Sequence, residues 1–176
     1  METEPEKAAD ALDNISRISR SSLEEVRSVV AVLREDEPSY QPAPGLADLP
    51  DLVETVRSTG LTVELTLPDD IEAIPRQTGA AVYRITREAL TNVVRHANAS
   101  TVSVHVDHRD RQVEVAIRDD GAEVGNGWGR DSGTGHGIVG MRERAEALGG
   151  SLSAGPAREG GFLVTASLPV GSDRPR

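Results

Sequence analysis

The fold is marked most clearly by the stretch Arg84-Ile-Thr-Arg-Glu88-Ala-Leu-Thr-Asn92-Val-Val-Arg95-His96-Ala-Asn98. Polar residues recur there at every fourth position, which keeps them near one face of a helix: Arg84, Glu88, Asn92 and His96. An apolar stripe at three- and four-residue spacing runs beside them: Val82, Ile85, Ala89, Val93 and Ala97. We therefore expect a helix from about Arg76 to Asn98 that packs on a core. Its polar side is either a solvated face or one wall of a site for a charged ligand.

The composition suits a folded protein with one ordinary domain and an appendage. The chain has 176 residues, 37% of them hydrophobic, 27% charged and only 2% aromatic. Its net charge of −10 argues against nucleic-acid backbones as partners. Cysteine is absent, which excludes disulfides and thiolate metal sites. We find neither a signal peptide nor an apolar run long enough to span a bilayer. We expect a cytoplasmic protein, or the cytoplasmic part of a membrane-anchored one.

The first part of the chain predicts a long helix followed by a linker. Apolar residues alternate at three- and four-residue spacing between Leu12 and Leu33, which is typical of a helix buried in a bundle. A helix over residues 1–36 is too long for any partner in the rest of the chain. We therefore expect pairing with a missing helix, with a second protomer, or with both; the alternative is packing along the globular domain. Residues 37–45, rich in proline, predict a linker, and residues 171–176 a polar tail.

Residues 46–170 predict a single domain of α+β class. We expect helices over 46–56, 76–98 and 138–148, and strands over 61–67, 101–108, 112–118, 151–154 and 162–168. Most strands follow one another as hairpins, so the sheet should be mostly antiparallel with helices on one face, as a two-layer sandwich. The glycine-rich stretch between Gly121 and Gly140 cannot pack a core and predicts a mobile functional loop or a disordered tip.

Three features in this domain suit a nucleotide. A carboxylate at a strand end, Asp119, can accept a hydrogen bond from the exocyclic amine of adenine, and Gly121 lets the backbone approach the ring. The glycine run from Gly133 leads into a helix, whose N-terminus attracts phosphates. Asn92 offers a neutral oxygen to Mg²⁺, and Glu88 lies one turn earlier, where it can orient or deprotonate a nucleophile.

These motifs together resemble those of sensor histidine kinases of the nitrate-sensor-like subfamily. The run Arg-Glu-Ala-Leu-Thr-Asn-Val-Val-Arg-His-Ala resembles the N box, Asp119-Asp-Gly121 the G1 box, and Gly133 to Arg144 the G2 box. The helix from Leu12 to Arg34 is similar to the second helix of the dimerisation domain. The resemblance implies the Bergerat fold shared with the gyrase, Hsp90 and MutL ATPases (the GHKL group).

The resemblance also implies roles for individual residues. Asn92 would be a Mg²⁺ ligand, Asp119 the adenine reader, and Arg95 and His96 contacts on the phosphate side. The remaining ATP-binding residues would be those of the nucleotide loop: Gly121, Gly133, Thr134, Gly135, His136 and Gly137. Glu88 and Asn92 would be the catalytic residues. ATP and Mg²⁺ are the implied cofactors, and a response regulator and a second copy of the chain are the implied partners.

The sequence departs from the family at three points. Glu123 stands where a second glycine is usual, and Phe162 stands where a threonine often contacts the base. Thr165 is the substitute candidate for that threonine. The phosphoacceptor histidine of the family is absent, because none of His96, His105, His108 and His136 has its context. We therefore expect a fragment that does not autophosphorylate alone.

Other interpretations remain open at this point. The run Gly135-His-Gly-Ile-Val-Gly140 also matches a dinucleotide fingerprint, but it lacks the preceding strand that this motif needs. An ATP-gated clamp of the gyrase type, a dimerisation module with a decayed nucleotide site and a serine kinase of the anti-sigma type are alternatives to a histidine kinase. His105 and His108 are expected to be exposed strand residues.

Overall fold

The computed structural model describes residues 43–121 and 135–171. The predicted N-terminal helix, most of the predicted linker, and residues 122–134 of the glycine-rich segment lie outside this described part, as does Glu123. Residues from Ala43 onward form one compact unit, separate from the unit that precedes it, and only this second unit is described below.

The described elements follow the predicted order. They are η1 (Leu46–Asp48), α2 (Leu49–Arg57), β1 (Thr62–Thr66), η2 (Ile71–Ala73), α3 (Arg76–Asn92), η3 (Val93–Ala97), β2 (Thr101–Arg109), β3 (Gln112–Asp119), α4 (Gly135–Glu146), β4 (Ser151–Pro156) and β5 (Phe162–Pro169). Two features differ from the expectation. The predicted helix over 76–98 ends in a π-helical segment, η3, and α4 begins three residues before Ile138.

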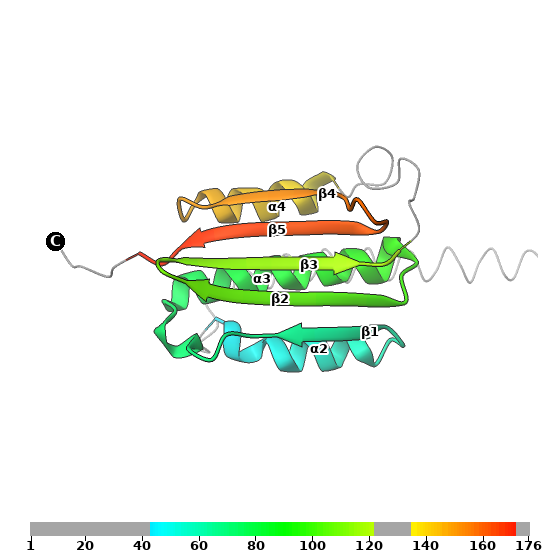
Figure 1. Ribbon diagram of the computed structural model, residues 1–176, viewed down its shortest axis with the longest axis horizontal. Coiled ribbons are helices and arrows are strands. Elements are labelled where there is room, and N and C mark those ends of the chain that lie inside the picture. Colours follow the sequence, from blue (N-terminus) through cyan, green and yellow to red (C-terminus); the bar gives the residue numbers. More distant parts are fainter. Residues whose placement is uncertain (1–42, 122–134, 172–176) are drawn as a thin grey trace, which may run out of the picture. The chain divides into compact units, whose positions relative to one another are not determined.

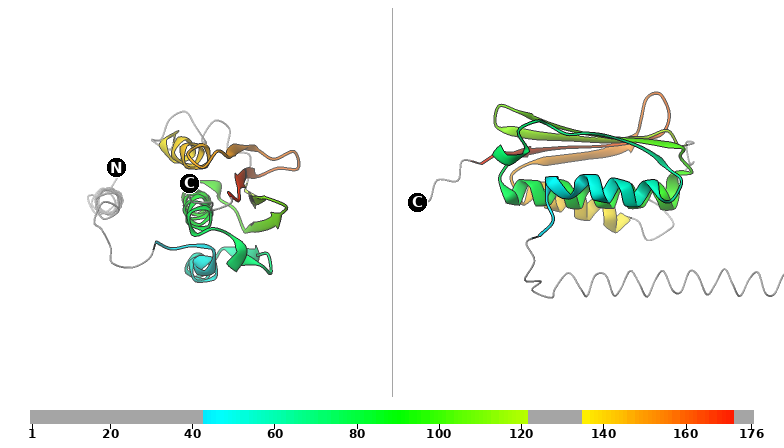
Figure 2. Two further views of the ribbon diagram at one scale, coloured as in Figure 1. Left: turned by 90° about the vertical axis from the view of Figure 1, so that its left-hand side faces the viewer. Right: turned by 90° about the horizontal axis from the view of Figure 1, so that it is seen from below.

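The strands form a five-stranded sheet in the order β1-β2-β3-β5-β4 (Figure 1). β1 lies parallel to β2, with Thr62 opposite Thr101, and the other neighbouring pairs are antiparallel. Helices α2, α3 and α4 all lie on one face of the sheet, and no described helix covers the other face (Figure 2). The predicted two-layer α+β sandwich with a mostly antiparallel sheet is thus confirmed.

The core lies between the helices and the sheet. The apolar stripe predicted on α3 and η3 is buried along its length: Val82, Ile85, Ala89, Val93 and Ala97. Strand residues that face the helices alternate with polar residues on the open face, as a one-sided sheet requires. Each fully buried Leu or Ile, such as Leu49, Ile85 and Leu90, stabilises the fold by roughly 1.5–3 kcal/mol.

The β2–β3 hairpin places one histidine differently from the expectation. Arg109 pairs with Gln112, so the turn consists of Asp110 and Arg111, and Asp110 has a left-handed φ of 54°. His108 lies at a position of β2 that faces the helices. Its side chain is only 11% exposed, and its Nδ1 lies 2.8 Å from Oδ2 of Asp70. The prediction of an exposed His108 was therefore wrong, whereas His105 is exposed.

Within the described residues, no helix combines the length and the apolar character needed to cross a bilayer.

Candidate functional site

The C-terminal end of α3 supplies the first part of the candidate site. Glu88 is half-buried there, and Asn92 is a buried polar residue with only 6% exposure. After Asn92 the helix widens into the π-helical segment η3, a distortion often found at functional sites, and it ends at Asn98 with a left-handed φ of 46°. Within η3, Arg95 is exposed and His96 is half-buried.

The end of β3 supplies a buried carboxylate. Asp119 is 4% exposed, and its Oδ1 accepts a hydrogen bond of 2.9 Å from the backbone N–H of Gly121. The backbone N–H of Phe162 also donates to this carboxylate. Burial raises the pKa of Asp119 above its usual value, and these two hydrogen bonds oppose that shift only in part. The fold therefore holds a carboxylate in a place where its charge is poorly solvated.

Two glycines allow the backbone segments to approach one another around Asp119. A Cβ at Gly121 would overlap the carbonyl oxygen of Ala97, the last residue of η3. A Cβ at Gly161, which has a φ of +79°, would overlap the carbonyl oxygen of Asp119. The end of η3, the end of β3 and the start of β5 therefore meet at this carboxylate, and they do so through backbone atoms.

The first turn of α4 lies against the polar side of α3. A Cβ at Gly137 would overlap Oε1 of Glu88 and would lie 3.5 Å from Nδ2 of Asn92. Because Gly137 is the third residue of α4, the N-terminus of this helix, with its unpaired N–H groups and positive dipole end, is close to Glu88 and Asn92. Two motifs about forty-five residues apart in the sequence are thus brought together by α3–α4 packing.

The structure brings some of the predicted site residues together and separates one. Glu88, Asn92 and Gly137 form one group, and Asp119 and Gly121 form another that is joined to the first by η3. Gly135 is the first residue of α4. Gly133, Thr134 and the side chain of His136 lie outside the described part of the chain.

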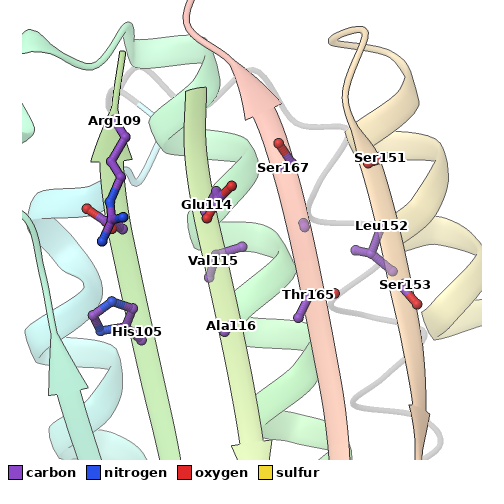
Figure 3. A pocket seen from close by; sticks show the side chains of 12 residues that line it. His105, Arg109, Glu114, Val115, Ala116, Ser151, Leu152, Ser153, Thr165 and Ser167 are labelled. Atoms are coloured by element: carbon purple, nitrogen blue, oxygen red, sulfur yellow. The ribbon is translucent and has the colours of Figure 1, made fainter. Parts of the chain in front are cut away.

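Thr165 is the residue that the structure separates from the others. It pairs with Ala116 and Ser153 on the open face of the sheet, whereas Asp119 faces the helices. There it borders a hollow of about 560 Å³, together with Ser153 and Ser167 (Figure 3). Its place in the alternation of β5, between buried Val164 and Ala166, explains this orientation. Thr165 therefore does not join the candidate site, in contrast to the expectation.

Three contributors to the site were missed from the sequence: Asp120, Gly161 and the backbone N–H of Phe162. The available signal in the sequence was the Gly160-Gly161 pair directly before β5, because adjacent glycines often mark a close backbone approach. In the structure, both glycines have a positive φ.

Comparison with known proteins identifies the family. A family model described as histidine kinase-, DNA gyrase B-, and HSP90-like ATPase matches residues 77–172, just over half of the chain. A second model, described as histidine kinase, matches residues 1–38. The fold is thus that of an ATPase-type domain. The chain belongs to the histidine kinase-, DNA gyrase B- and HSP90-like ATPase family, and the resemblance predicted from the three motifs is confirmed.

Several curated relatives are named sensor histidine kinases. YxjM of Bacillus subtilis (strain 168) is 34% identical over 172 residues, which cover 97% of this chain and 40% of that protein. DesK of the same organism is 30% identical over 175 residues, which cover 96% of this chain and 43% of that protein. The nitrate/nitrite sensor protein NarQ of Escherichia coli (strain K12) is 31% identical over 162 residues, which cover 92% of this chain and 28% of that protein. The chain therefore spans less than half the length of these relatives.

Solved structures agree on the fold. The histidine kinase domain of the blue-light activated histidine kinase from Erythrobacter litoralis EL346 superposes with a TM-score of 0.55 at 18% identity, covering 75% of this chain and 65% of that one.

Proposed function

We propose that this chain is the catalytic ATP-binding domain of a sensor histidine kinase, joined to part of its dimerisation domain. It binds Mg-ATP and transfers the γ-phosphate to a histidine on the dimerisation domain, for relay to a response regulator. The match of residues 1–38 to a histidine kinase model supports the dimerisation assignment and a homodimeric parent protein. It also favours this function over a gyrase-type clamp.

The observation that carries the proposal is the buried carboxylate of Asp119. Its Oδ1 is engaged by the N–H of Gly121, and the N–H of Phe162 approaches from β5, so the side chain cannot rotate freely. A carboxylate has about four lone-pair sites and no donor when ionised, so after these two hydrogen bonds it can still accept from a ligand. The exocyclic amine of adenine is such a donor, whereas guanine presents a carbonyl at the same edge. This supports selective binding of ATP.

The residues at the end of α3 could hold a magnesium ion that is bound together with the nucleotide. Among the described residues, no three acidic or histidine side chains gather as a metal cluster. Mg²⁺ commonly takes only one or two protein ligands and completes its shell with water and phosphate oxygens. Asn92 is a buried amide beside the glycine cradle at Gly137, so its oxygen suits the single protein ligand. When bound, Mg-ATP supplies the transferable phosphoryl group and the charge that neutralises it.

The chain's own residues would then position the reacting groups. The N–H groups in the first turn of α4 suit phosphate oxygens, because Gly137 brings that turn against Asn92. Glu88 shares this cradle and is half-buried, so its carboxylate can accept a hydrogen bond from the incoming imidazole and orient its free nitrogen. Arg95 is exposed on η3, where it can pair with a phosphate.

Calorimetric titration of this chain with Mg-ATP and with Mg-GTP tests the proposal. We expect binding of ATP and no measurable binding of GTP. Phosphotransfer is then tested in the full-length parent protein with labelled ATP, followed by acid-labile phosphohistidine. Binding of neither nucleotide would instead support a dimerisation module with a decayed site. Binding of ATP with hydrolysis but without phosphohistidine would support a clamp-type ATPase.

A further inference from the structure

Asp120, next to the buried Asp119, has a carboxylate that binds backbone and not ligand. Its Oδ1 accepts hydrogen bonds of 2.8 Å from the N–H of Ser100 and 2.8 Å from the N–H of Thr101. The backbone N–H of Asp120 donates in turn to the carbonyl oxygen of Thr101 at 3.1 Å. These bonds to Ser100 and Thr101 hold the pKa of Asp120 below its usual value, although the side chain is exposed.

The side chain extends the β2–β3 ladder by one step. The last backbone pair of this ladder is Val102 with Asp119. Beyond it, the carboxylate of Asp120 takes the place of the next carbonyl acceptor. The carbonyl oxygen of Ser100 at the same time accepts from the N–H of Thr62, which begins β1. Ser100, the last of the three residues between η3 and β2, is therefore held on one side by β1 and on the other by Asp120.

Ser100 lies close in the chain to the point where the two halves of the candidate site meet. Ala97 ends η3, only three residues before Thr101, and its carbonyl oxygen lies where a Cβ of Gly121 would be. On one side of this contact is Asn92 with Glu88 and Gly137, the half assigned to phosphate and magnesium. On the other side is Asp119, the half assigned to adenine. A shift of the 98–100 segment would move η3 relative to Asp119.

We propose that Asp120 is a positioning residue, which clamps the segment after η3 to the end of β3 and so sets the spacing between the adenine half and the phosphate half of the site. This inference rests on the proposed ATP-binding function. It assigns no contact with the nucleotide to Asp120. Its importance should therefore be largest for a ligand that spans both halves, and small for a ligand that occupies only one.

Mg-ATP serves as the ligand that spans both halves of the site, and adenosine as the ligand that occupies only the adenine half. Three substitutions of Asp120 separate the effect of side-chain geometry from the effect of charge. Asp120→Ala removes the acceptor. Asp120→Asn keeps an oxygen at the same place without the charge, and Asp120→Glu keeps the charge but moves the oxygen by one methylene. Asp69→Ala is the matched control, because Asp69 is an exposed aspartate for which the structure shows no partner among the described residues. Binding is measured by calorimetry for Mg-ATP and by amide chemical shifts of Gly121 and Phe162 for adenosine.

We expect Asp120→Ala and Asp120→Glu, which disturb both backbone hydrogen bonds, to raise the Kd for Mg-ATP by about tenfold through the altered spacing of the two halves. The Kd for adenosine should rise by less than about threefold, since adenosine reads only the Asp119 half. Asp120→Asn should behave like the parent chain, as should Asp69→Ala. In the nucleotide-free protein, the amides of Ser100 and Thr101 should lose protection from hydrogen exchange in the Ala and Glu variants only.

Equal weakening of Mg-ATP and adenosine would overturn the inference and assign Asp120 a general structural role. An unchanged Kd for Mg-ATP in both the Ala and the Glu variants would also overturn it, while leaving the proposed function intact. If Asp120→Ala does not fold, the contrast between Asn and Glu still decides, because a Glu variant with parental affinity contradicts a clamp set by geometry. Absence of Mg-ATP binding by the parent chain defeats the proposed function itself, and this inference with it.

Discussion

Replacing Asp119 by asparagine should separate nucleotide affinity from protein stability. The asparagine oxygen can still accept the hydrogen bond from the N–H of Gly121, which measures 2.9 Å in the parent structure. The substitution removes a charge from a side chain that is only 4% exposed and whose pKa burial raises. It also turns one oxygen acceptor into an amide donor, which cannot accept a hydrogen bond from the amine of adenine.

The size of the two effects follows from these contacts. A hydrogen bond to a charged group contributes about 1.5–3 kcal/mol, so the Kd for Mg-ATP should rise by about tenfold to 150-fold. The free energy of unfolding should stay within about 1 kcal/mol of the parent value, because the asparagine oxygen keeps the hydrogen bond from Gly121 and the substitution removes a buried charge. Loss of affinity without loss of stability is the signature of a charge that the fold holds for its ligand.

The pH dependence of stability provides a second measurement of the same carboxylate. The pKa of Asp119 is higher in the folded chain than its ordinary value of 3.8, so the folded chain binds this proton more tightly than the unfolded chain. Asp119 therefore favours the folded state at low pH, and this contribution is lost as the pH rises through the raised value. The Asp119→Asn variant has no titratable group at this position, so its stability does not decrease in this way as the pH rises. Its stability relative to the parent should thus increase as the pH rises from below 3.8 towards neutrality.

Calorimetry with Mg-ATP and urea unfolding at several pH values test these expectations on the same two proteins. Parental affinity for ATP in Asp119→Asn would refute the assignment of Asp119 to adenine. A loss of more than about 2 kcal/mol in unfolding free energy would show that the carboxylate is needed for the fold, and not primarily for the ligand.

Three further substitutions test other parts of the structure. Asn92→Ala should abolish the increase in ATP affinity that Mg²⁺ produces, while binding in EDTA is retained, because it removes only the proposed metal ligand. Gly137→Ala should displace the flexible end of Glu88. In the full-length kinase proposed above, it should slow phosphotransfer by about tenfold or more, with a smaller change in ATP affinity. Thr86→Val should raise the unfolding free energy by about 1 kcal/mol, because the Thr86 hydroxyl is buried without a hydrogen-bond partner among the described residues.

Each of these substitutions has a contradicting result. Equal loss of ATP binding with and without Mg²⁺ in Asn92→Ala would assign that residue to the nucleotide itself. Parental phosphotransfer in Gly137→Ala would show that Glu88 does not act from its observed position. A destabilised Thr86→Val would mean that its hydroxyl is satisfied in solution, and Thr86→Ser, which keeps the hydroxyl, is the matched control.

The sequence was sufficient for the elements whose burial pattern has a clear period. The three- and four-residue spacing of α3 and the alternation of β2 and β3 each point to a single buried face, and the structure buries that face. The π-helical end of α3 was not predictable in this way. Its last residue, Ala97, closely approaches Gly121, and local propensity does not connect two residues so distant in sequence.

The structure differs from the expectation for Thr165, a candidate site residue, and for His108, expected only to be an exposed strand residue, and the two differences have a common cause. Thr165 and His108 were assigned from residue type, although both lie in strands where position alone decides which face a side chain occupies. Thr165 falls between buried Val164 and Ala166, and His108 continues the buried series of Val104 and Val106. Counting from the apolar neighbours would have placed both correctly. The pairing of His108 with Asp70 could not be read from the sequence, because η2 has no strong pattern of its own.

The position of β3 in the sheet bears on how the protein responds to its ligand. β3 is the middle strand in the order β1-β2-β3-β5-β4, so both of its edges are paired and its amides should be among the last to exchange with solvent. The carboxylate at its end is therefore attached to a part of the fold that opens only when the domain unfolds. Any rearrangement that accompanies the proposed nucleotide binding should occur on the α4 side, while the Asp119 side stays a fixed reference against which that movement can be measured.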